Sequence, residues 1–211
     1  NLMTNTVNYN NAKKMIDLEN MVDFFVAETY YINDDWIGNW VGNLKLWREQ
    51  KTDAQWRYLL YDLDFGLGLY GASYSFDKLD DAMNPLASSK HSIMLKKLLT
   101  NTTFKNYFIN RYADLINTVF LPSYLNNLVD GFYNELKNEM PYEWNRWFTD
   151  RKYTWDETVL EVRDFINNRP LYARNHIQNY FSLTGQTTVT LNVANDTAAG
   201  RIKISTIYPK P

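Results

Sequence analysis

The chain of 211 residues carries 22 lysine and arginine residues against 24 aspartate and glutamate residues, so its net charge is −2, and it has no cysteine. This balance, with no basic stripe, argues against nucleic acid as a partner. The absence of cysteine excludes a disulfide framework and a cysteine-ligated metal. No apolar run reaches about 18 residues, so the sequence predicts no membrane span.

The first 62 residues of the chain contain three different patterns. Residues 1–14 are polar and rich in asparagine, which predicts a loop or linker. Residues 17–31 place apolar side chains at helical spacing, which predicts a helix. Residues 43–62 hold two apolar-rich runs around the polar segment Glu49–Ala54, which predicts a β-hairpin. The hairpin is expected to pack around core aromatic residues, namely Trp36, Trp40, Trp47 and Trp56.

The remaining chain is expected to be mainly helical. The glycines and the Asn-Pro pair within residues 67–89 predict an irregular loop, at the place where protein kinases have their activation segment. From His91 onward the apolar periodicity predicts a helical bundle. One of its helices is expected to be capped by Thr102 or Thr103, and two others to begin near Pro122 and Pro141. A further helix over 156–168 is expected to end before Pro170, and another to follow it as far as residue 181.

At Gly185 the pattern changes to alternation. Residues 187–193 and 201–205 alternate around a polar turn, which predicts a C-terminal β-hairpin or the start of a following β domain. The predicted fold class is therefore α+β and mostly α, with a central hairpin, a helical bundle and a C-terminal hairpin.

A set of oxygen-bearing side chains surrounds the central hairpin. Asp34 and Asp35 precede Asn39, and Asp62 and Asp64 end the second run, where residues two apart share a face. Mg²⁺ prefers hard oxygen ligands and leaves room for phosphate and water. Protein kinases use one aspartate for the substrate hydroxyl, an asparagine five residues later for metal and a second aspartate after a hairpin. We therefore expect these side chains to converge on one open cleft, within reach of a shared Mg²⁺.

Local sequence leaves a second interpretation open for each of these groups. Asp34, Asp35 and Asn39 also suit a helix cap or an Asx-turn, and Asp62 and Asp64 also suit a solvated turn. The two histidines, at positions 91 and 176, lack metal-ligand spacing and are expected to be ordinary helix residues.

Six short motifs along the chain are characteristic: Asp35-Trp36-x-Gly38-Asn39, Leu46-Trp47-Arg48, the run from Gln55 to Asp64, Glu143-x-x-Arg146-Trp147, Phe165-x-x-x-Arg169-Pro170 and Ile177-x-x-Tyr180-Phe181. In these motifs the chain resembles the spore coat protein H (CotH) kinase-like family over roughly residues 15–183. Two features depart from the family pattern. Trp40 stands where many members have a second asparagine, and no glycine-rich phosphate loop precedes Asp34, since the first glycine is Gly38.

The resemblance implies an atypical protein-kinase-like fold that uses ATP with Mg²⁺ or Mn²⁺ to phosphorylate Ser or Thr of a surface or secreted protein. By position, Asp35 is implied as the catalytic aspartate. Asn39 is implied as a metal or phosphate partner, and Asp62 or Asp64 as the metal ligand. Arg146 and Arg169 are expected to brace the fold.

The departures lead to a division of the chain. We expect residues 1–14 to be a linker, 15–183 to be the C-terminal portion of the kinase-like domain, and 184–211 to be the β segment. We expect these 211 residues to be a fragment of a longer protein. Because no segment that grips phosphate is found in them, we expect the fragment alone to bind ATP weakly and to transfer little phosphate. Thr-rich, Gly-turn β segments are common in secreted bacterial proteins, which favours an extracytoplasmic location.

The alternative is a non-catalytic surface module that binds a glycan or a protein. The aromatic content of 16% favours it. A glycosidase is a more distant alternative, since it needs two carboxyl groups about 5 to 9.5 Å apart across a cleft.

Overall fold

The computed structural model describes residues 2–37, 42–84, 89–147, 153–191 and 202–209. This part of the chain forms eight α-helices and one two-stranded antiparallel sheet, so the fold is α+β and mostly α, as predicted. No helix within these ranges has the length and apolar character needed to cross a membrane. The elements are α1 Thr6–Met15, α2 Leu18–Tyr30, β1 Lys45–Trp47, β2 Arg57–Leu59, a 3₁₀ turn Leu69–Gly71, α3 Lys78–Met83, α4 Lys90–Leu98, α5 Thr102–Ile116, α6 Pro122–Leu136, α7 Met140–Trp147 and α8 Trp155–Tyr180.

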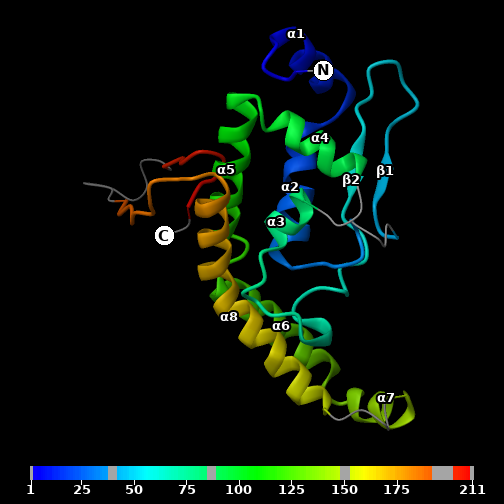
Figure 1. Ribbon diagram of the computed structural model, residues 1–211. Helices are drawn as coiled ribbons and strands as arrows, with labels where there is room; N and C mark the ends of the chain where they lie inside the picture. The colour runs from blue at the N-terminus through cyan, green and yellow to red at the C-terminus, as the bar shows by residue number, and fades with distance from the viewer. Residues whose placement is uncertain (1, 38–41, 85–88, 148–152, 192–201, 210–211) are drawn as a thin grey trace.

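Helix α2 forms the centre of the core, between the hairpin and helices α5 and α8 (Figure 1). It begins where the Asp17 side chain accepts a hydrogen bond from the Asn20 amide at 3.0 Å. Apolar residues cover most of its circumference, as expected for a helix buried on all sides. The predicted helix over 17–31 is therefore confirmed. Phe24 stacks on Tyr58 of β2 with ring centroids 4.8 Å apart, which fixes the hairpin to α2.

The predicted central hairpin is confirmed, with a shorter ladder than expected. Lys45 pairs with Leu59 and Trp47 with Arg57. The strand ends at Leu59, so the acidic residues at 62 and 64 lie in the loop after it. Trp36 is fully buried as predicted, whereas the tryptophans at 47 and 56 are about two-fifths exposed, so their assignment to the core was wrong. Trp40 lies outside the described residues.

The expectation of a loop over residues 1–14 was wrong, because α1 begins at Thr6. The side chain of Asn5 accepts hydrogen bonds from the amides of Val7 and Asn8, and so supplies the cap that starts the helix. The end of α1 is tied to the hairpin, since the Trp56 amide donates to the Met15 carbonyl at 2.8 Å.

The expected irregular loop over 67–89 contains a short helix, α3. Asp77 caps it by accepting a hydrogen bond from the Asp80 amide at 3.0 Å. Leu79, Ala82 and Met83 bury one side of the helix against α2. The apolar residues of this segment are too few to show helical periodicity. Their packing against α2 stabilises the helix instead.

The helical region after His91 follows the prediction apart from two points. Pro122 occupies the first turn of α6 as expected. The cap of α5 is Asn101 rather than a threonine. Pro170 does not divide the last helix, because α8 runs unbroken from Trp155 to Tyr180. The buried residues Phe165, Arg169, Ala173 and Ile177 on both sides of the proline pack against the core and keep the two halves in one helix.

Arg169 braces the fold as predicted. It is buried, and its guanidinium donates to four backbone carbonyls: those of Thr29 and Tyr30 at the end of α2, and those of Tyr74 and Phe76 in the loop before α3. Arg146, in contrast, is exposed, with its guanidinium 4.9 Å from the ring centroid of Trp147. The expectation that Arg146 acts as a brace was therefore wrong.

The predicted C-terminal hairpin is not formed in the described residues. Residues 184–191 have no strand, and residues 192–201, which hold the predicted turn, lie outside the described ranges. After them there is one isolated antiparallel bridge, between Ile204 and Ile207. Hydrogen bonds hold this segment against α5, since the amide and hydroxyl of Thr206 both donate to the Asp114 carboxylate.

Candidate functional site

Two acidic segments that are distant in sequence meet beyond the end of α2. Ile32 has a φ of 56°, a left-handed conformation that turns the chain after the helix. The Leu67 amide donates to the Tyr31 carbonyl at 2.9 Å. The Asn33 side chain donates to the Asp62 carbonyl at 3.4 Å. The turn that carries Asp34 and Asp35 therefore lies beside the loop that carries Asp62 and Asp64.

Gly66 allows this close approach. A β-carbon at position 66 would lie 2.9 Å from the Tyr31 carbonyl oxygen and 3.2 Å from that of Leu63. Because both are backbone atoms, they cannot move aside as a flexible side chain can. Only glycine fits here, so the glycine of the Asp-Phe-Gly segment, residues 64–66, has a structural reason apart from any chemistry.

Among the described residues, Asn43 is the one that holds Asp35 by hydrogen bonds. The Asn43 side-chain amide donates to Asp35 Oδ2 at 2.6 Å, and its backbone amide donates to the Asp35 carbonyl at 3.3 Å. The second carboxylate oxygen, Oδ1, is enclosed and has no hydrogen-bond partner in the described structure. A buried carboxylate oxygen without a donor is costly, and a bound cation or hydroxyl would satisfy it.

The carboxyl groups of Asp62 and Asp64 lie together, and both are exposed. A hydrogen bond with Asp64 raises the pKa of Asp62, and slight desolvation and the charges of Asp64 and Asp35 raise it further. Asp62 also has a φ of 57°, a left-handed conformation that aspartate adopts more readily than most side chains. The alternation expected for a strand predicted that Asp62 and Asp64 share a face. In the structure both residues lie in the loop after β2, and the loop brings their carboxyl groups together.

Asn39, the fourth predicted site residue, lies outside the described residues. Within the described ranges, no group of three or more acidic or histidine side chains is arranged to hold a metal ion. A kinase-type Mg²⁺ takes only one or two protein carboxylates and completes its shell with phosphate and water. The paired carboxyl groups of Asp62 and Asp64 are the described residues that could supply these carboxylates.

Two buried polar residues behind Asp35 were missed by the sequence reasoning. Glu28 is fully buried, and burial raises its pKa to about 7, while the hydrogen bond from Asn33 lowers it and the charge of Asp35 raises it. Asn33 donates to Glu28 at 2.8 Å as well as to the Asp62 carbonyl, so it connects the two acidic segments. The signal in the sequence was a glutamate next to the apolar stripe of the predicted helix.

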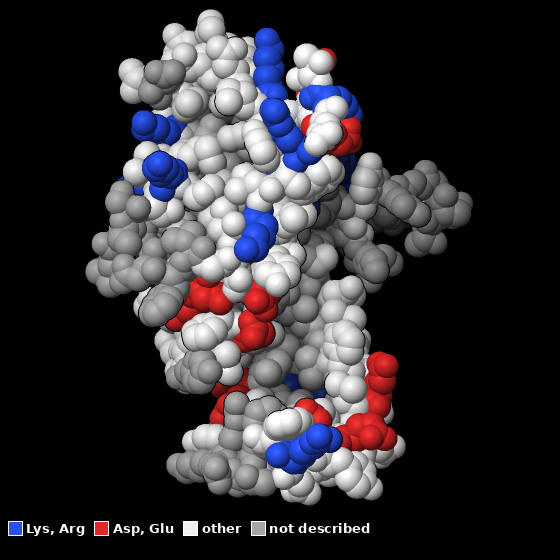
Figure 2. Space-filling model, turned by 90° about the vertical axis from the view of Figure 1, so that its right-hand side faces the viewer, with Lys and Arg blue, Asp and Glu red and all other residues white. Residues whose placement is uncertain are grey.

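Lys78 was also missed. It is the first residue of α3, and its ammonium group donates to Asp34 at 2.5 Å and to Asp81 at 2.8 Å. Its side chain is only 3% exposed. On the face shown in Figure 2, acidic side chains gather at mid-height beside a hollow, and basic side chains lie mostly above them. The histidines are helix residues as expected, in α4 and α8.

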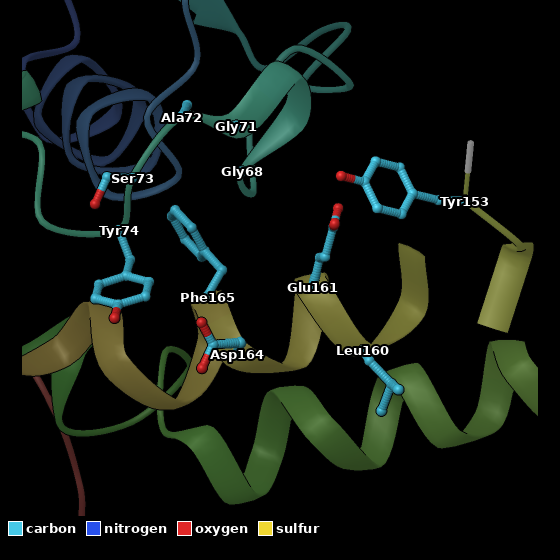
Figure 3. Close-up of a pocket in the computed structure, with 10 residues that line it drawn as sticks. All are labelled: Gly68, Gly71, Ala72, Ser73, Tyr74, Tyr153, Leu160, Glu161, Asp164 and Phe165. Carbon is cyan, nitrogen blue, oxygen red and sulfur yellow. The ribbon is translucent and has the colours of Figure 1, made fainter. Parts of the chain in front are cut away.

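A groove of about 740 Å³ lies next to this region, between the loop after the Asp-Phe-Gly segment and helix α8. Figure 3 shows Glu161 and Phe165 rising from α8 toward the loop with Gly68 and Gly71, while Tyr153 approaches from the opposite end. Aromatic rings and two carboxylates, from Glu161 and Asp164, line the groove. The predicted site residues Asp35, Asp62 and Asp64 do not line it.

The fold is mostly helical, and the hairpin and the end of α2 bring the aspartate-containing segments together. The family described as CotH kinase protein matches residues 1–173, so the chain belongs to the CotH kinase family. Comparisons with curated proteins and with solved structures gave no match. Membership suggests the use of ATP and a metal, and it implies a protein substrate.

Proposed function

We propose that the protein is an atypical protein kinase that transfers phosphate from ATP to a Ser or Thr hydroxyl of a surface or secreted protein. The observation that supports this most is the pairing of the Asp62 and Asp64 carboxyl groups near Asp35, in a chain of the CotH kinase family. The Thr-rich sequence after residue 184 is our reason for assigning an extracytoplasmic location.

In this proposal Asp35 orients the acceptor hydroxyl and takes its proton. The hydroxyl oxygen bonds to the γ-phosphorus, the bond from that phosphorus to the β–γ bridging oxygen breaks, and ADP leaves. The Asn43 side-chain amide donates to Asp35 Oδ2 at 2.6 Å, which fixes the orientation of this carboxylate. Most of the rate would come from positioning, because a loose phosphoryl-transfer transition state requires little covalent chemistry from the protein.

Asp62, Asp64 and Asn39 are the residues that would hold a divalent cation on the nucleotide. When bound, Mg²⁺ or Mn²⁺ supplies positive charge to the phosphate oxygens. The raised pKa of Asp62 fits this role, because two adjacent carboxylates gain a compensating charge only when a cation is present.

The test is Mg·ATP binding and phosphate transfer by the full-length protein, beside the 211-residue chain alone. We expect the full-length protein to transfer phosphate, and Asp35→Ala and Asp62→Ala to abolish transfer without unfolding it. Asp64→Ala tests whether the second carboxylate also contacts the metal. Equally tight nucleotide binding by both proteins would place the phosphate grip within residues 1–211, contrary to our expectation.

A second candidate is a non-catalytic module that binds a glycan or a protein in the groove beside α8. The specific observation is its lining of Tyr74, Tyr153 and Phe165 with Glu161 and Asp164, since aromatic faces and carboxylates are what sugar rings and hydroxyls contact. If a folded full-length protein transfers no phosphate with either metal, and Tyr74→Ala weakens binding to an oligosaccharide panel, this candidate replaces the first.

A further inference from the structure

Lys78 occupies a position that is unfavourable for lysine in two respects. It is the first residue of helix α3, where the helix dipole favours negative rather than positive side chains. Its ammonium group is also buried, although lysine is rarely found fully buried without a partner. When a residue breaks local rules in this way, a contact elsewhere in the fold compensates for it.

The compensating contacts are with two carboxylates on different segments. Asp81 lies on α3 itself, one turn further along. Asp34 is 44 residues earlier in the chain and directly precedes Asp35. The Asp34–Lys78 pair therefore links α3 to the turn that carries Asp35.

The other end of this link is fixed by α8. Arg169 donates to the carbonyls of Tyr74 and Phe76, which lie just before α3. The backbone of Lys78 itself donates to the Phe76 carbonyl at 3.0 Å. The start of α3 is thus held by a buried side chain of α8, and Lys78 extends from this fixed point to Asp34.

We propose that Lys78 is a positioning residue for Asp35. It holds the Asp34–Asp35 turn in place and supplies positive charge next to it, where Asp34 and Asp35 would otherwise repel each other. This inference rests on the proposed kinase function. Without Lys78 the turn moves away from α3, so Asp35 no longer contacts the acceptor hydroxyl. Asp62 and Asp64, which would hold the cation on the nucleotide, keep their positions.

The experiment compares Lys78→Met, Asp34→Asn and the double variant in the full-length protein. Because a displacement of about 1 Å can cost roughly 100-fold in rate, we expect each single variant to lower kcat roughly 10- to 100-fold, with the KM for ATP almost unchanged. The double variant should be no slower than the slower single variant, since both remove one contact. Lys78→Arg should recover part of kcat, because arginine keeps the charge. Arg111→Met is the matched control, because it breaks a partly buried ion pair between Arg111 of α5 and Asp23 of α2.

A second measurement does not depend on transfer. The Asn43 amide donates to the Asp35 carbonyl, so its hydrogen exchange reports whether the turn is in place. We expect Lys78→Met to speed this exchange at least about tenfold, on the scale of local opening, and Arg111→Met to leave it unchanged. Unchanged exchange and kcat in Lys78→Met would refute the role of Lys78. Faster exchange in Lys78→Met, together with a wild-type protein that transfers no phosphate, would keep Lys78 as the residue that holds the turn and would refute the kinase function instead.

Discussion

Replacement of Glu28 by glutamine should change how stability depends on pH. The Glu28 carboxyl is fully buried at the end of α2, beside the acidic segments. Burial raises its pKa from an ordinary 4.5 to about 7, although the hydrogen bond from Asn33 and the charge of Lys78 lower it. The folded protein therefore keeps this proton at pH values where the unfolded chain has already lost it.

The sign follows from this difference in proton binding. The stability that the protonated carboxyl contributes is fully present below pH 4.5 and is lost as the pH rises through about 7. The interval from 4.5 to about 7, at about 1.4 kcal/mol per pH unit, corresponds to roughly 3 kcal/mol of unfolding free energy. Glutamine keeps an oxygen that can accept from Asn33 but has no proton to lose. Glu28→Gln should therefore gain roughly 2 to 3 kcal/mol over the wild type between about pH 5 and pH 8.

Urea unfolding followed by circular dichroism at several pH values measures this difference on the 211-residue chain. Glu19→Gln is the matched control, because Glu19 lies on the same helix and is exposed to water. We expect its unfolding free energy to run parallel to that of the wild type. If the Glu28→Gln curve also runs parallel to the wild type across this range, the carboxyl does not hold its proton in the folded protein and the reasoning from burial is wrong.

Two further substitutions test the scaffold. Arg169→Met removes a buried guanidinium that donates to four carbonyls, and we expect a loss of about 3 to 5 kcal/mol in chemical unfolding, against less than about 0.5 kcal/mol for the exposed Arg146→Met. Gly66→Ala should destabilise by more than about 1 kcal/mol, because its β-carbon would lie 2.9 Å from a backbone oxygen. Gly131→Ala, in helix α6 with nothing within 4 Å of its β-carbon, should stabilise by about 0.5 to 1 kcal/mol. Equal effects at the two glycines would contradict the close approach at position 66.

The elements that could be predicted from sequence are those whose signal is local. The helix over 17–31 repeats apolar residues at helical spacing, and α6 starts at a proline, so both were found. Helix α8 was divided wrongly at Pro170, because local rules give the cost of the proline but not the packing of its neighbours against the core. Helix α1 was missed because its sequence lacks apolar periodicity. The local signal for its start is a single cap residue, Asn5.

The same distinction applies to the candidate site. Asp35, Asp62 and Asp64 could be assigned from sequence because their motif is short and ordered along the chain, and their roles stay a prediction. Glu28 and Lys78 were missed because their significance depends on contacts made across the fold: a buried carboxyl beside Asp35, and an ammonium group that reaches Asp34 from 44 residues away. Periodicity assigns such residues to a helix face and says nothing of what they meet there.

The central claim is most directly tested by radiolabelled phosphate transfer from ATP, with Mg²⁺ or Mn²⁺, by the full-length protein and its Asp35→Ala and Asp62→Ala variants. We expect the wild type to label Ser or Thr in a protein acceptor, and both variants to lose the labelling while their circular dichroism spectra stay unchanged. Undiminished labelling by Asp35→Ala, or none by a well-folded wild type across both metals and a range of acceptors, would contradict the kinase function.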